Sequence, residues 1–157
     1  MNNITILAAA LLIGLSFITV GCGKKQKPMP TTETKVNVKT TNPIEIAKPQ
    51  LSENLKFVMN SGWQIIDTNK IYITKSQDFE KAYFIGTLVK NGSQIYNCIW
   101  FSNSDTLDGV TMAANDYAIN ASSMPDARKS QAGIKATDDG YSRINQKLLY
   151  DWNSSGK

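Results

Sequence analysis

Residues 82–102 read AYFIGTLVKNGSQIYNCIWFS and carry the strongest local structural signal in the chain. It holds two runs rich in β-branched and aromatic residues, which favour strands, joined by Asn91-Gly92. Asn-Gly between two such runs is typical of a type I′ hairpin turn, because both central residues of that turn need a positive φ. The stretch therefore predicts an antiparallel hairpin with a two-residue loop, in which Lys90 lies opposite Ser93.

Side chains along the two predicted strands, 82–90 and 93–102, alternate between the two faces of the sheet. One face carries Phe84, Leu88, Ile95, Ile99 and Phe101. The other carries Tyr83, Ile85, Val89, Tyr96, Cys98 and Trp100. Neither face is polar, so we expect one to pack on helices. The second face is then left to a second helix, to a segment of the preceding chain or to a partner.

The second face is also the candidate site that the sequence offers. Tyr83, Tyr96 and Trp100 are of the aromatic types enriched at interface hot spots, and an exposed apolar patch is typical of a docking site. In the predicted register Tyr83 lies opposite Trp100, and Thr87 lies opposite Tyr96. We therefore predict a partner-binding surface formed by Tyr83, Tyr96 and Trp100, with core packing as the alternative use of these rings.

The rest of the chain after residue 50 predicts short strands before the hairpin and helices before and after it. Apolar spacing and caps place a helix at 53–60 behind Ser52, strands at 63–66 and 71–74, a helix at 110–122, and a helix at 141–152 behind Asp138 or Asp139. Strands followed by helices indicate an α+β fold. Residues 51–157 are therefore expected to form a single globular α+β domain, a small antiparallel sheet of about four strands with two to three helices packed on it.

The N-terminal segment is apolar from Ile4 to Val20 and continues with Gly21 and Cys22. Small residues that close an apolar run are typical of a processed signal peptide. The stretch Thr19-Val20-Gly21-Cys22 resembles the lipobox of bacterial lipoproteins.

This resemblance implies that residues 1–21 are a signal peptide, and that Cys22 receives a diacylglycerol thioether and becomes the new N-terminus. Acyl chains such as palmitate would then hold the protein on the membrane, because two chains give stable attachment whereas one does not. The implied location is extracytoplasmic, anchored to a bacterial membrane in the cell envelope. An uncleaved membrane helix and a plain secreted protein are the alternatives.

Charge is concentrated in the segment that follows the apolar run. The whole chain carries 17 Lys+Arg against 13 Asp+Glu, a formal net charge of +4. Residues 22–50 hold six lysines and two glutamates, which is 6 − 2 = +4, whereas residues 51–157 hold 11 basic and 11 acidic side chains. A nucleic-acid-binding domain carries its basic excess on the folded surface, so no nucleic acid is predicted as a partner.

Residues 22–50, with the lipidated cysteine at their start, are rich in lysine, threonine and proline. This composition does not bury enough apolar area to form a core and predicts a flexible basic tether. Two short alternating patterns within it, Val36–Val38 and Ile44–Ile46, leave an alternative open, because each is suited to a short edge strand on the domain.

The chain contains no histidine and only two cysteines. This excludes the usual serine and cysteine hydrolase dyads, which need a histidine base. No metal-binding or cofactor-binding motif is found in the sequence, so we predict a protein without a cofactor, a metal or catalytic residues. Cys98, in the middle of a strand, is expected to be a small buried hydrophobic residue.

These observations favour a lipoprotein whose domain is a non-enzymatic binding module of the cell envelope. A phage- or plasmid-type exclusion lipoprotein agrees with the same size and layout. A small envelope hydrolase is a further alternative, since Asp78 with Glu80, or Asp105 with Asp138-Asp139, would supply the carboxylate pair of glycoside chemistry.

Overall fold

The computed structural model of the chain describes residues 41–155. The predicted signal peptide, the lipidation site at Cys22 and the tether as far as residue 40 lie outside the described residues. Within the described part, no helix is both long and apolar enough to cross a membrane.

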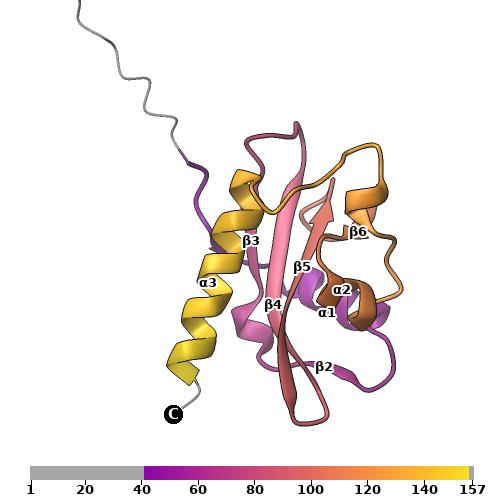
Figure 1. The fold of residues 1–157 in the computed structure, drawn as a ribbon, viewed down its shortest axis with the longest axis vertical. Helices are drawn as coiled ribbons and strands as arrows, with labels where there is room; N and C mark the ends of the chain where they lie inside the picture. The colour runs from indigo at the N-terminus through magenta and orange to yellow at the C-terminus, as the bar shows by residue number, and fades with distance from the viewer. Residues whose placement is uncertain (1–40, 156–157) are drawn as a thin grey trace, which may run out of the picture. The chain divides into compact units, whose positions relative to one another are not determined.

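Six strands, three α-helices and two short 3-10 helices follow one another along residues 41–155 (Figure 1). The strands are β1 (Glu45–Ile46), β2 (Trp63–Ile65), β3 (Tyr72–Lys75), β4 (Tyr83–Asn91), β5 (Gln94–Ser102) and β6 (Thr111–Ala113). The α-helices are α1 (Pro49–Val58), α2 (Asp116–Ala121) and α3 (Asp139–Ser155). The 3-10 helices are η1 (Thr68–Lys70) and η2 (Ala127–Lys129).

All six strands belong to one sheet, in which β4 has the most neighbours. The order is β1-β3-β4-β5-β6, and β2 pairs with the part of β4 beyond the end of β3. Every one of these strand pairs is antiparallel. The predicted α+β class is therefore confirmed. The sheet has six strands rather than about four, because β1 was expected to be part of the tether and β6 part of a helix.

The hairpin is confirmed, but its turn lies one residue further along the chain than expected. Asn91 pairs with Gln94, so Gly92 and Ser93 form the loop. Gly92 has a φ of 61°, and Ser93 does not have a positive φ. This combination matches a type II′ turn with glycine at its first central position. The register differs from the predicted one by two residues, a shift that keeps every side chain on its predicted face.

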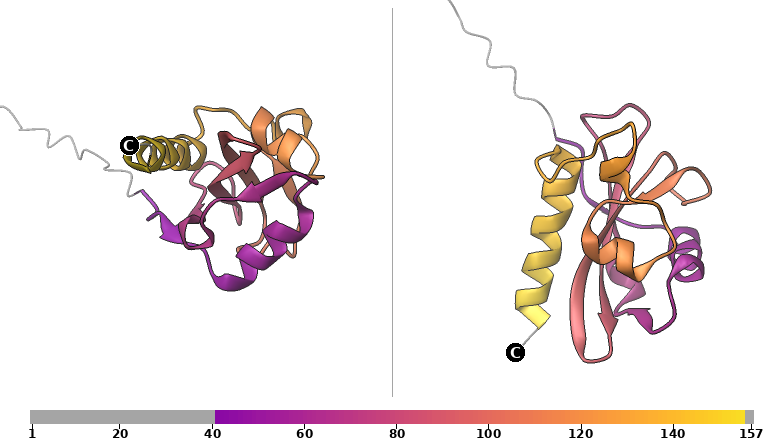
Figure 2. Two further views of the ribbon diagram at one scale, coloured as in Figure 1. Left: turned by 90° about the horizontal axis from the view of Figure 1, so that it is seen from below. Right: turned by 45° about the vertical axis from the view of Figure 1, so that its right-hand side comes forward.

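Helices cover both faces of the sheet (Figure 2). On one face α3 packs against Phe84 and Ile99, and its Ile144 and Leu148 are buried there. On the other face α1 and α2 pack against Ile85, Val89, Cys98 and Trp100. The second face was expected to be covered by a second helix, a segment of the preceding chain or a partner. The structure shows that helices cover it.

Two glycines allow α3 to lie close to the sheet. A Cβ on Gly86 in β4 would overlap the side chain of Ile144. A Cβ on Gly140, in the first turn of α3, would overlap the ring of Phe84. Because neither place has room for a methyl group, these two glycines set the distance between α3 and the sheet.

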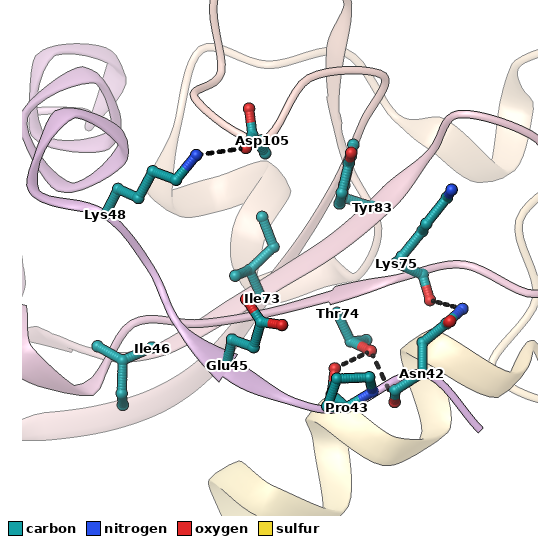
Figure 3. A pocket seen from close by; sticks show the side chains of 10 residues that line it. All are labelled: Asn42, Pro43, Glu45, Ile46, Lys48, Ile73, Thr74, Lys75, Tyr83 and Asp105. Carbon is teal, nitrogen blue, oxygen red and sulfur yellow. Dashed lines mark hydrogen bonds and ion pairs between the residues drawn. The ribbon is translucent and has the colours of Figure 1, made fainter. Parts of the chain in front are cut away.

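The chain before α1 is attached to the sheet through β1 and the residues that precede it (Figure 3). The Asn42 side-chain amide donates to the Lys75 carbonyl at 3.0 Å. The Thr74 hydroxyl donates to the Pro43 carbonyl at 2.9 Å. The alternative of an edge strand at 44–46 is confirmed by β1, and the expectation of a flexible tether is wrong for this part of the chain.

The expected start of the domain, residue 51, falls inside the first turn of α1. The helix begins after Lys48, with Pro49 at its first position, where the missing N–H of proline costs no helical hydrogen bond. Ser52 was expected to be the cap. It is instead buried within the helix, and its hydroxyl has no hydrogen-bond partner among the described residues.

The helix predicted over 110–122 is wrong in its first half, which forms β6 on the end of β5. The second half is helical as α2, and it begins after Asn115, whose side chain accepts a hydrogen bond from the Ala118 N–H at 2.9 Å. The helix predicted over 141–152 is confirmed as α3, which is longer at both ends.

Candidate interaction surface

The edge of β5 next to the hairpin turn is open. Because β6 pairs only with Trp100–Ser102, residues 94–99 have no neighbouring strand on the side away from β4 within the described chain. In an antiparallel ladder, the N–H and C=O of a residue point to the same side, and the side alternates along the strand. The pair Asn91–Gln94, which closes the two-residue loop, directs the backbone groups of Gln94 toward β4. The backbone N–H and C=O groups of Ile95 and Asn97 therefore point away from β4.

Asn115 closes one end of this edge with its side chain. Its Nδ2 donates to the Asn97 carbonyl at 2.8 Å, and its Oδ1 accepts from the Ile99 N–H at 3.3 Å. These contacts agree with the outward direction derived above. They leave the N–H and C=O of Ile95 and the N–H of Asn97 without a hydrogen-bond partner among residues 41–155.

Aromatic side chains from both helical layers border the open edge. On the α2 side the ring of Tyr96 lies between Trp63 and Tyr117, with centroid distances of 5.1 Å and 5.2 Å. On the α3 side Trp152 borders the same space. The space is an open groove of about 450 Å³, which we call the edge groove. It is lined by residues 93–97, Tyr117 and Trp152, none of which is charged.

A smaller apolar cavity of about 250 Å³ adjoins the edge groove, since Ile95 and Trp152 line both. Ile66, Leu88 and Leu148 form its other apolar walls. Ile66, Ile95 and Trp152 are 44%, 38% and 38% exposed, which is high for large apolar side chains. The apolar surface thus continues from β5 to the end of α3, as is typical of an interaction site.

A buried polar network holds the C-terminal half of α3, and with it Trp152, against the sheet. Asp151 is 7% exposed. Lys147 Nζ donates to Asp151 Oδ1 at 2.6 Å, and the Tyr72 hydroxyl donates to Asp151 Oδ2 at 2.5 Å. Lys147 Nζ also lies 4.6 Å from the centroid of the Tyr72 ring. These contacts tie α3 to β3.

The network shifts the pKa of each member. Burial disfavours the charged form of Asp151, but the hydrogen bonds from Lys147 and Tyr72 outweigh it, so the pKa of Asp151 lies below its usual value. The hydrogen bond to Asp151 raises the pKa of Lys147. Burial and the hydrogen bond to Asp151 raise the pKa of Tyr72.

The network predicts a loss of stability in acid. Because the folded-state pKa of Asp151 is depressed, its contribution is present above the unfolded-state pKa of about 3.9 and is lost as the pH falls through the folded-state pKa. Asp151→Asn should therefore lower the free energy of unfolding at neutral pH and flatten its decline between about pH 5 and pH 2. Urea denaturation at a series of pH values measures both effects. Lys147→Met should flatten the decline in part, and an unchanged decline in Asp151→Asn would contradict the assignment.

The three predicted partner-binding residues do not form one surface. Trp100 is fully buried, and its Nε1 donates to the Ser122 hydroxyl at 3.0 Å, so its assignment to a partner-binding surface is wrong. Tyr83 is half-buried at the far end of β4, six residues from Val89, which is the partner of Tyr96. Tyr96 alone lies in the edge groove, where its hydroxyl donates to the side chain of Gln94.

Tyr83 lines a different cavity, of about 330 Å³, between β1 and the loop after β5 (Figure 3). Lys48 and Asp105 form an ion pair of 2.9 Å across it. The hydrogen bond and charge of Asp105 raise the pKa of Lys48. The Asn42 and Thr74 side chains in its lining are bonded to backbone carbonyls of the same lining. The contacts around this cavity therefore hold the chain before α1 against the sheet.

The carboxylates considered for hydrolysis have structural contacts. Asp78 accepts from the Asp139 N–H at 2.8 Å, and Asp138 accepts from the Lys135 N–H at 2.8 Å. Within the described chain, no group of three or more His, Cys, Asp or Glu side chains is placed to hold a metal ion. Cys98 is fully buried, as predicted, and burial raises the pKa of its thiol.

Tyr117, Ile95 and Trp152 are surface residues that were not among the predicted partner-binding residues. Tyr117 and Trp152 belong to the apolar stripes of their helices, so pattern alone favours their burial. Ile95 shares its predicted face with core residues, and only the ending of β6 at the far part of β5 leaves it exposed.

The chain matches no known family model, no curated protein and no solved structure.

Proposed function

We propose that the protein is a bacterial lipoprotein, anchored outside the cytoplasm through a lipid on Cys22, and that its domain is a non-enzymatic binding module of the cell envelope. The module binds an extended segment of protein at the open edge of β5. The lipobox-like stretch before Cys22 supports the anchor. The edge groove supports the binding role.

One observation carries the binding role: the N–H and C=O of Ile95 and the N–H of Asn97 have no hydrogen-bond partner among residues 41–155, and they belong to the lining that Tyr117 and Trp152 share. A strand added to an exposed sheet edge gains main-chain hydrogen bonds, and pockets for alternate side chains give specificity. The edge groove offers both.

The anchor would restrict where the module finds its partner. Residues 23–41 separate Cys22 from Asn42, the first residue seen to bond to the sheet. The chain from Cys22 to Asn42 spans no more than about 72 Å when fully extended. The binding surface therefore acts close to the membrane that carries the lipid.

The anchor is tested at its cysteine. Cys22→Ala should abolish the incorporation of labelled palmitate and release the protein from its stable membrane attachment, because the thioether forms on the Cys22 sulfur and the remaining thiol, Cys98, is buried in the domain. Metabolic labelling and fractionation of whole cells measure both effects. Cys98→Ala is the matched control and should label like the unchanged chain, since Cys98 is fully buried in the domain. Continued labelling of the Cys22→Ala chain, or no labelling of the unchanged chain, would contradict the lipoprotein assignment.

A further inference from the structure

We infer that the open edge of β5 takes up residues 35–39 of a neighbouring copy of the same chain, added to the sheet as one more strand. This inference rests on the proposed function, because it names the occupant of the same edge groove.

The edge requires a short extended segment. The N–H and C=O of Ile95 need an acceptor and a donor from one opposing residue, as in a hydrogen-bonded antiparallel pair. The N–H of Asn97 needs a second acceptor two residues further along. Beyond Asn97 the edge is closed by Asn115, so the added strand is confined to a few residues. The rings of Tyr96 and Tyr117 on one side favour apolar side chains on that side.

Residues 35–39, Lys-Val-Asn-Val-Lys, supply this pattern. Valine favours strands, and its alternation with polar residues gives the segment one apolar side. With Asn37 opposite Ile95 in an antiparallel arrangement, Val36 comes to lie opposite Tyr96, and Val38 opposite Gln94. β-Branched and aromatic residues placed opposite each other on neighbouring strands stabilise a sheet. The lysines fall at the two ends of the segment.

The segment of the same chain does not reach this edge. Asn42 is bonded to the Lys75 carbonyl, at the level where Lys75 pairs with Tyr83. Ile95 lies opposite Lys90, seven residues further along β4, or about 24 Å along the strands. Three strand spacings add about 14 Å across the sheet. The direct separation is thus about 28 Å, whereas the five residues from Asn37 to Asn42 span at most about 18 Å.

The strand must therefore come from another copy. Each chain then has one strand to donate and one edge to accept a strand, so the contact is heterologous and joins chains head to tail. Anchoring would favour this contact, because it confines donor and acceptor to a layer near one membrane and so raises their effective concentration.

The test uses two full-length chains with different tags, expressed together and oxidised in their membranes. One chain carries Asn37→Cys and the other Ile95→Cys. Cα atoms of a hydrogen-bonded antiparallel pair lie about 5.5 Å apart, which suits a disulfide. We expect about tenfold more disulfide-linked heterodimer than when the second chain carries Gln64→Cys, an exposed position on β2, because docking raises the local thiol concentration. Val36→Lys in the Asn37→Cys chain should abolish the excess.

Other outcomes separate this inference from the proposed function. A homodimer linked through Ile95→Cys in the absence of Asn37→Cys would show pairing of two β5 edges and overturn the inference. An adduct of Ile95→Cys with a different protein would overturn it while supporting the binding role of the edge groove. No adduct of any kind at position 95, in cells where Cys22 is labelled with palmitate, would overturn both the inference and the binding role but not the anchor.

Discussion

Trp100→Ala is expected to lower the free energy of unfolding by about 3–5 kcal/mol, because a fully buried tryptophan leaves both lost transfer energy and a cavity. The same change leaves the Ser122 hydroxyl without its indole donor. Small domains are stable by about 5–15 kcal/mol, so the variant should be largely unfolded at moderate urea concentrations. Urea denaturation followed by circular dichroism measures the loss.

Tyr117→Ala is the matched control for this prediction. Tyr117 is 44% exposed and stands at the edge groove, so its truncation should cost far less stability than that of Trp100. Equal losses from the two variants would contradict the placement of Trp100 in the core and Tyr117 at the surface. If the Trp100→Ala domain kept its stability, the Trp100 ring would not be packed in the core and would again be a candidate surface residue.

Gly86→Leu is expected to cost about 3 kcal/mol or more, since overpacking a tight contact forces side chains and backbone to move. Even the first added carbon would overlap Ile144 and approach Leu148 Cδ1 to 3.0 Å. The chain cannot relieve this overlap without moving α3 away from β4. Thermal and urea unfolding of Gly86→Ala and Gly86→Leu should show a graded loss.

Gly92→Ala provides the comparison for Gly86. A Cβ at Gly92 meets nothing within 4 Å, so only the positive φ of 61° opposes the change, at a cost of about 1–2 kcal/mol. A second variant tests the contact itself: Ile144→Ala combined with Gly86→Ala should lose less than the sum of the two single changes, because the first makes room for the second. Additive losses would show that α3 and β4 are not in the contact described.

The hairpin could be predicted because it depends on local signals. Alternating side chains assign Phe84 and Ile85 to opposite faces in any register shifted by an even number of residues. The turn itself was less certain, since Gly92 suits the second central position of a type I′ turn and the first of a type II′ turn equally well. The structure has the type II′ turn, and the side chains of both strands keep their predicted faces of the sheet.

The error over Trp100 and the one over 110–122 have the same cause. Both depend on contacts between segments far apart in the chain, which residue patterns do not record. Thr111 to Ala113 become a strand because the end of β5 offers them a partner. Trp100 is covered because α1 and α2 both fold onto the second face. Of the candidate surface only Tyr96 was predicted, and the rest was missed for the same reason, since the open edge at Ile95 exists only because β6 is short.

The attachment of the chain before α1 also has a mechanical consequence. Any load applied to the N-terminal side of Asn42 falls first on β1 and on the bonds of Asn42 to Lys75 and Arg143. These contacts are few, and we expect them to break one after another, starting at Asn42. Their release would free the chain between residues 42 and 48, which spans at most about 22 Å when fully extended. The paired strands β4 and β5 would not yet bear force, so the domain can yield at this point before its core does.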